Sequence, residues 1–176
     1  MKYLTKPEIE RLLVTVKDKG DKCLIQLGLV TGCRVSEVVG IRLGHIKDGV
    51  IKVYDHKKDR YREVVIDPET AGLISEYLAY GWKAEGYGPR LLFYFGTRTA
   101  NRKLRKYCNE SNIPPEKAHW HTLRHTYVVQ SLEAGVPLNH ITEQTGDSPT
   151  TIISIYGKPS TDSRRQMIGS KGAYWR

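Results

Sequence analysis

Cysteine is scarce in this chain of 176 residues, and the few present form no pattern typical of a crosslinked or metal-bound fold. Cys23, Cys33 and Cys108 are odd in number and include no Cys-x-x-Cys pair. A disulfide framework needs paired cysteines and a structural zinc site needs closely spaced ligands, so the sequence argues against both. Their absence favours a reducing setting, and we expect an intracellular, cytoplasmic protein.

Long apolar runs are missing as well. No segment approaches the about 20 apolar residues that a membrane-spanning helix requires, so no membrane partner is expected. The first residues, MKYL, do not open a signal-peptide core, and the chain shows neither an internal repeat nor a low-complexity stretch. A chain of this length buries most of its apolar surface, which predicts one globular domain.

Acidic residues are outnumbered by basic ones. Lysine and arginine together number 28 against 19 aspartates and glutamates, which gives a net charge of +9 and a pI near 9.5. Excess positive charge favours a polyanionic partner, most commonly nucleic acid. Charge alone is equally compatible with an ordinary basic soluble protein, so evidence for nucleic-acid binding has to come from sequence motifs.

Hydrophobic periodicity and capping signals predict a mainly α fold with one small antiparallel β-sheet, an α+β arrangement. Residues 50–54 and 62–66 alternate like strands, and the polar stretch between them is typical of a hairpin turn. Helices are expected from a capping box at residues 5–8, at 22–30, from 35, from 68, and at 100–111, 122–134, 138–145 and 149–155. Residues 86–89 are expected to form a loop, and the tail from residue 157 is expected to be mobile.

Four short segments together carry side chains suited to transferring a DNA strand. They are residues 31–37 (TGCRVSE), the pair Lys57-Lys58, residues 121–125 (HTLRH) and Tyr156. Arg34 and Arg124 can each grip phosphate oxygens with a planar fork. A lysine can protonate a departing oxygen, a histidine can handle a second proton, and a tyrosine can attack phosphorus.

In this order and spacing, the segments resemble the catalytic domain of the tyrosine recombinases, also called phage-type integrases. Family members carry an arginine after a Thr-Gly turn and an acidic residue three positions later, which match Arg34 and Glu37. A lysine on a β-hairpin follows, then a His-x-x-Arg-His element, then a turn whose histidine or tryptophan precedes the nucleophilic tyrosine by nine residues. Here Asp147 stands at that turn position, nine residues before Tyr156.

The resemblance implies the tyrosine recombinase catalytic-domain fold, double-stranded DNA as partner and a prokaryotic cell or viral-element host as location. Tyr156 would attack the scissile phosphate, form a 3′-phosphotyrosyl intermediate and release a 5′-hydroxyl. Rejoining would need neither ATP, metal nor another cofactor, and no carboxylate cluster suited to two metals is evident. The implied catalytic residues are Arg34, Lys57, His121, Arg124 and Tyr156, supported by Glu37, Lys58, His125 and Asp147. The expected DNA contacts are Lys57, Lys58, Arg60, Arg62, Arg102, Lys103 and Arg105.

Two assignments stay open at this stage. Counting back from Arg62, which matches the family's strand arginine, gives Lys57 as the general acid, whereas counting forward from Arg34 gives Lys58. Asp147, when ionised, can only accept hydrogen bonds and would repel a phosphate. It could be offset by the arginines or stay protonated, but we favour a role as a helix cap that turns away from the site.

The expected organisation is a catalytic domain over residues 1–159 and a tail, residues 160–176, that docks on its own domain or on a neighbouring subunit. Because the expected catalytic domain begins near residue 5, we expect the amino-terminal DNA-clamp domain that family members usually carry to be absent, either because the chain is a fragment or because the protein is naturally short. We expect a monomer in free solution that self-associates on DNA. The alternatives are a type IB topoisomerase, which shares the chemistry, and a noncatalytic helix-turn-helix regulator formed by residues 138–156.

Overall fold

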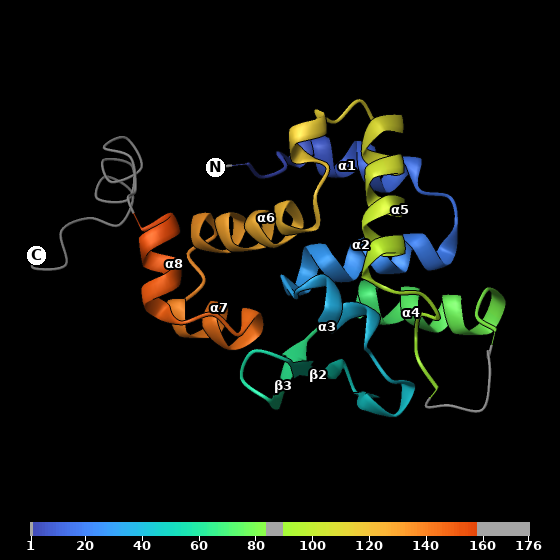
Figure 1. Ribbon diagram of the computed structural model, residues 1–176, viewed down its shortest axis with the longest axis horizontal. Helices are drawn as coiled ribbons and strands as arrows, with labels where there is room; N and C mark the ends of the chain where they lie inside the picture. The colour runs from blue at the N-terminus through green and yellow to red at the C-terminus, as the bar shows by residue number, and fades with distance from the viewer. Residues whose placement is uncertain (1, 84–89, 158–176) are drawn as a thin grey trace, which may run out of the picture. The chain divides into compact units, whose positions relative to one another are not determined.

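The computed structural model describes residues 2–83 and 90–157, and a boundary after Gly146 divides them into two compact units. The predicted mainly α fold with a small antiparallel sheet is confirmed (Figure 1). The first unit contains the helices α1 (Lys6–Thr15), α2 (Lys19–Thr31), α3 (Val35–Val39), α4 (Pro68–Tyr80), α5 (Thr97–Glu110), α6 (Trp120–Glu133) and α7 (Leu138–Thr145). Two short 3₁₀ turns, η1 (Leu43–His45) and η2 (Pro115–Lys117), connect parts of it. The loop expected at 86–89 and the tail 160–176 lie outside the described residues.

Side-chain caps decide where several helices begin. The capping box predicted at the start of α1 is confirmed, because the Thr5 backbone N–H donates to Glu8 Oε2 at 2.7 Å. α2 begins at Lys19, earlier than expected, because the Asp18 side chain accepts from the Asp21 backbone N–H at 2.8 Å. The sequence pattern located the apolar body of this helix and missed its polar first turn.

The sheet has three antiparallel strands, β1 (Ile46–Lys47), β2 (Val50–Asp55) and β3 (Arg60–Val65), in the order β1-β2-β3. The predicted hairpin is confirmed, with Val53 opposite Arg62 and Asp55 opposite Arg60. Both strands are longer at the turn end than their apolar alternation indicated: β2 continues to Asp55 and β3 begins at Arg60. The turn therefore covers only residues 56–59. β1 is two residues long and was not predicted, because so short a strand has no alternation to detect.

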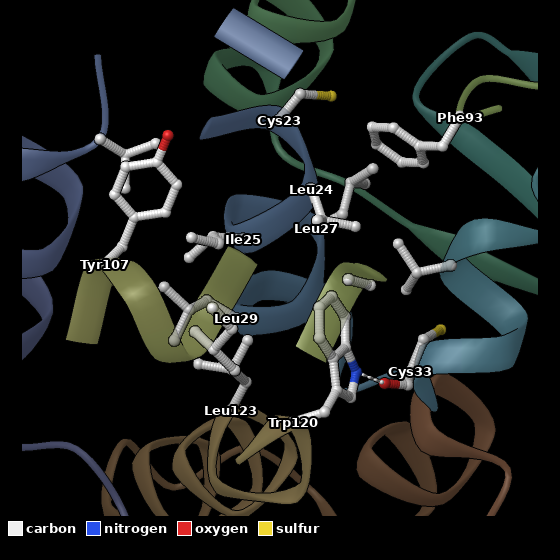
Figure 2. Packing of buried hydrophobic residues seen from close by; sticks show 14 of the residues in the cluster. Cys23, Leu24, Ile25, Leu27, Leu29, Cys33, Phe93, Tyr107, Trp120 and Leu123 are labelled. Carbon is white, nitrogen blue, oxygen red and sulfur yellow. Dashed lines mark hydrogen bonds between the residues drawn. The ribbon is translucent and has the colours of Figure 1, made fainter. Parts of the chain in front are cut away.

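The core forms around α2, which packs against α4 and α6. Figure 2 shows Leu24 and Leu27 of α2 close to Phe93 and the indole of Trp120. Gly28 lets α2 and α6 approach closely, because a Cβ there would lie 2.9 Å from Trp120 and 2.8 Å from Leu123. Each large apolar side chain buried here stabilises the fold by about 1.5–3 kcal/mol. This packing fixes the C-terminal half of α2 against the beginning of α6.

The second unit is described through residue 157 and contains α8 (Pro149–Tyr156), in agreement with the expected helix. Its N-cap is Ser148, whose hydroxyl accepts from the Thr151 backbone N–H at 3.1 Å. The expectation that Asp147 caps this helix is therefore wrong, because Asp147 precedes the cap by one residue. Among residues 2–83 and 90–157, no helix has the length and apolar content needed to cross a membrane.

Candidate active site

The turn that follows α2 is held in place by two side chains of α6. Gly32 adopts a left-handed conformation with φ 61°, and a Cβ there would lie 2.6 Å from Tyr127. Trp120 Nε1 donates to the Cys33 carbonyl at 3.0 Å (Figure 2), and Arg124 Nη1 donates to the Gly32 carbonyl at 2.6 Å. The residue after this turn is Arg34, so both predicted phosphate-binding arginines are anchored on one turn. We call Arg34 and Arg124 the arginine clamp.

Glu37 fixes the conformation of Arg34. Its carboxylate accepts from the Arg34 backbone N–H at 2.7 Å and from Arg34 Nη1 at 3.2 Å. Glu37 is 2% exposed, whereas the Arg34 side chain is 28% exposed. The guanidinium of Arg34 is thus held by a buried partner and still accessible to an anion, as a phosphate-binding side chain must be.

Arg62 is placed differently from the other residues expected to contact DNA. Its side chain is only 9% exposed, and its two terminal nitrogens donate to both oxygens of Glu37, at 2.8 and 3.0 Å. Nη2 also lies within hydrogen-bonding distance of the carbonyls of Thr145 and Gln144, at 3.1 and 3.3 Å. Burial lowers the pKa of Arg62, but the hydrogen bonds and charge of Glu37 outweigh it and raise the pKa above its ordinary value.

Asp55 is a site residue that the sequence reasoning missed. It is 2% exposed, and its Oδ1 lies 3.7 Å from Arg34 Nη1 and accepts from the backbone N–H of Lys57 at 2.9 Å. Burial raises its pKa, but the Lys57 N–H, the charge of Arg34 and the Lys58 N–H together hold that pKa below its ordinary value. An aspartate that ends a strand before a polar turn is the available signal, because its side chain can organise the turn backbone.

The two hairpin lysines are both exposed, but their ammonium groups differ in their contacts. Lys58 Nζ donates to the Gly146 carbonyl at 2.8 Å. Lys57 contributes its backbone N–H to Asp55, and within the described chain its ammonium donates no hydrogen bond. Lys57 is therefore the lysine whose ammonium is available to a ligand at the hairpin tip.

The His-x-x-Arg-His element lies in the first turns of α6. His121 was expected to precede this helix, but α6 begins at Trp120, so His121 lies within its first turn. Its ring is exposed, that of His125 is half-buried, and the two ring centroids are 5.9 Å apart in an edge-to-face arrangement. Arg124 between them is 5% exposed and points its guanidinium to the turn after α2.

The expected DNA contacts on α5 fall into two groups. Arg102 and Arg105 are exposed, as is Arg60 at the start of β3. Lys103 is half-buried, and its ammonium lies 2.6 Å from an oxygen of the buried Asp21. The charge of Lys103 is therefore partly neutralised by the protein, whereas Arg102 and Arg105 present theirs to the solvent.

Tyr156 and Asp147 belong to the second unit. Tyr156 is the last residue of α8 and is half-buried, and Asp147 is also half-buried.

The three cysteines are buried and free, and the described residues contain no group of three or more His, Cys, Asp or Glu side chains placed to hold a metal ion.

Comparison with known proteins identifies the family. The chain matches the phage integrase family over residues 2–162 and belongs to that family. It is 27% identical over 157 residues to tyrosine recombinase XerD of Yersinia pestis, covering 84% of this chain and 52% of that protein. It is 30% identical over 155 residues to XerC of Chlamydia caviae, covering 83% and 49%. The chain thus spans about half the length of these curated relatives.

Solved structures share the fold. The XerA recombinase matches with a TM-score of 0.84 and 24% identity, covering 99% of this chain and 66% of that one. The Tn1549 transposon integrase, solved in complex with transposon right end DNA, matches with a TM-score of 0.79 and 19% identity, covering 97% and 66%. The catalytic domain of bacteriophage HP1 integrase matches with a TM-score of 0.68 and 19% identity, covering 98% and 99%. The predicted tyrosine recombinase catalytic-domain fold is confirmed.

Proposed function

We propose that residues 1–159 form the DNA-cleaving and rejoining domain of a site-specific recombinase. Tyr156 loses its hydroxyl proton and attacks the scissile phosphorus, which forms a 3′-phosphotyrosyl bond and breaks the bond to the 5′ oxygen. That oxygen takes up a proton and leaves as a hydroxyl. Attack of a 5′-hydroxyl on the phosphotyrosyl bond reverses the step, so the bond energy is kept and rejoining needs no ATP.

The arginine clamp is the observation that carries this proposal. Arg34 and Arg124 are anchored on one turn, and Arg34 combines a conformation fixed by buried Glu37 with a partly exposed guanidinium. Two arginine forks stabilise the negative charge that grows on the non-bridging oxygens during attack. The same positive charge favours the ionised tyrosine, whose free pKa is about 10.

The remaining roles follow from position and chemistry. We assign Lys57 as the acid that protonates the leaving 5′ oxygen, because the ammonium of Lys58 is bonded to Gly146. His121, exposed in the first turn of α6, handles the proton of the attacking tyrosine, and His125 supports it. Arg60, Arg102 and Arg105, together with Lys57, contact the DNA backbone.

Double-stranded DNA is the proposed substrate, and joining two duplexes calls for more than one subunit. We therefore propose self-association on DNA and a monomer in free solution, inside the cell that holds the recombining DNA. Sedimentation at micromolar concentration checks this: a stable dimer without DNA would contradict it.

A suicide DNA substrate, nicked beside the cleavage site so that the short released strand diffuses away, tests the reaction. The wild-type protein should accumulate a covalent adduct, whereas Tyr156→Phe should bind the same DNA equally well and form none. DNA binding without any adduct from the wild-type protein would favour a helix-turn-helix regulator. Relaxation of supercoiled plasmid that lacks a recombination site would favour a type IB topoisomerase.

A further inference from the structure

The last turn of α7 is fastened to the β-hairpin by three side chains. Arg62 Nη2 donates to the carbonyls of Gln144 and Thr145, and Lys58 Nζ donates to that of Gly146. The Gln144 amide forms two hydrogen bonds with the backbone of Val65 on β3, at 3.0 and 2.5 Å. Carbonyls at the end of a helix have no partner within it, so the hairpin supplies the partners here.

One guanidinium serves this helix end and the arginine clamp at once. Arg62 donates to both oxygens of Glu37, and Glu37 holds the backbone and the side chain of Arg34. A planar fork with five N–H donors can serve a carboxylate and two carbonyls from one fixed position. A lysine has a single nitrogen and cannot reach both sets of acceptors in this way.

Gly146 closes the network. Its φ is 75°, and a Cβ there would lie 3.0 Å from Arg62 Nε and 3.2 Å from Asp55 Oδ2. The backbone therefore passes directly over buried charged groups, with no room for a side chain. Gly146 is also the last residue of the first unit, and Tyr156 follows it by ten residues.

We propose that Arg62 is a positioning residue for strand cleavage. Through Glu37 it orients Arg34 of the clamp, and through the carbonyls of Gln144 and Thr145 it fixes the point at which the chain leaves the first unit toward Tyr156. This inference rests on the proposed function. Its consequence is that losing Arg62 impairs cleavage in two separable ways, one through the clamp and one through α7.

The test compares three variants with the wild-type protein and a matched control. Arg62→Met removes both connections and Arg62→Lys keeps only the charge. Gln144→Met removes the two hydrogen bonds between α7 and Val65, which weakens the attachment of α7 while leaving the contacts of Glu37 intact. Arg11→Met is the control, because Arg11 is an exposed arginine on α1 that donates to the Ser111 carbonyl at 3.4 Å, away from the clamp. Each protein is assayed for adduct formation in a single turnover at saturating DNA, for DNA affinity and for thermal unfolding.

We expect Arg62→Met to form adducts about 100-fold more slowly and Arg62→Lys about tenfold more slowly, because small misplacements of reacting groups cost this much. DNA affinity should change by less than about threefold, and Arg11→Met should match wild type. All rates are measured below the unfolding transition of every variant. If Arg62→Met fails to fold, Arg62→Lys and Gln144→Met carry the comparison.

A second substrate separates the two connections. A methylphosphonate at the scissile position is neutral and depends less on the clamp. We expect it to rescue Arg62→Met and Arg62→Lys only in part and Gln144→Met not at all, because the α7 contact remains lost. Complete rescue of both Arg62 variants, or near-wild-type rates for Arg62→Lys and Gln144→Met on normal DNA, would overturn the inference.

The wild-type reaction distinguishes this failure from failure of the proposed function. If the wild-type protein forms no adduct with Tyr156, the proposed function is wrong and the positioning role falls with it. If the wild-type protein forms the adduct and the variants form it equally fast, only the positioning role is wrong.

Discussion

Arg62 and Glu37 form a buried, two-point ion pair, with Nη1 2.8 Å from Oε1 and Nη2 3.0 Å from Oε2. Removing two charges from water is costly, and apolar residues of similar volume often stabilise a fold as well as a buried pair does. A contribution to the stability of the fold therefore does not explain why the ion pair between Arg62 and Glu37 is present. The geometry of the pair explains its presence better, because Glu37 also holds Arg34, the partly exposed arginine of the clamp.

The clamp depends on fork geometry as well as on charge. Arg34→Lys and Arg124→Lys keep the charge and lose two-point binding of the phosphate. We expect each to slow cleavage at least tenfold, a loss of about 1.4 kcal/mol of transition-state stabilisation. Single-turnover adduct formation at equal DNA occupancy measures the effect, and near-normal rates in both variants would exclude a shared phosphate site.

Substitution of either hairpin lysine should slow DNA cleavage, but for a different reason at each position. Lys57→Met should cleave normal DNA poorly but a substrate with a 5′-bridging sulfur well, because a thiol, with a pKa of about 8.5, leaves without an acid. Lys58→Met loses the hydrogen bond to the Gly146 carbonyl, so the 5′-bridging sulfur substrate should not restore its cleavage rate. Adduct rates on the two substrates decide, and the reverse pattern would assign Lys58 as the acid.

The basic side chains of α5 should contribute unequally to DNA binding. Arg102→Gln and Arg105→Gln each remove an exposed charge, and each should lower the slope of log affinity against log salt by about 1. Lys103→Gln should change the slope by less than half as much, since Lys103 already pairs with Asp21. Titrations of one duplex over a range of salt concentrations measure the slopes; equal changes at all three positions would contradict the structural distinction.

Asp55 should make the fold sensitive to acid. Although burial opposes ionisation, the Lys57 N–H and the charge of Arg34 hold the pKa of Asp55 below its ordinary value of 3.8. A lowered folded pKa means that the stabilisation is complete above the unfolded value and is lost as the pH falls through the folded value. The difference in unfolding free energy between wild type and Asp55→Asn, measured in urea, should therefore shrink from pH 7 to pH 3. A difference that stays constant or grows in acid would show that the ionised carboxylate is not the cause.

Much of the fold was predictable because its signals are local. The capping box at Thr5 and Glu8 and the proline after Asp67 lie next to the helices that they begin. The motif residues of the clamp could be located for a similar reason, since each belongs to a short segment that resembles one family. Spacing along the chain also singles out Tyr156 among the tyrosines, and that assignment stays a prediction until the adduct is mapped.

The connections between segments were not predictable in the same way. Arg62 carries the same charge as its neighbour Arg60, and its partners Glu37 and Thr145 lie 25 and 83 positions away. Only the folded structure shows that the side chain of Arg62 is 9% exposed whereas Arg60 is exposed. The prediction of the α8 cap was wrong for a local reason. Asp147 and Ser148 are both good N-cap residues, and the sequence does not decide between them.

Peptide mapping of the trapped adduct shows whether Tyr156 becomes covalently attached to a DNA 3′ end. Trypsin should release residues 125–164 as one peptide, because the bond after Lys158 precedes a proline. That peptide contains two tyrosines, Tyr127 and Tyr156, so fragmentation in a mass spectrometer assigns the modified one. We expect a nucleotide joined through its 3′-phosphate to the hydroxyl oxygen of Tyr156. A nucleotide on Tyr127, or on any other residue, would contradict this expectation.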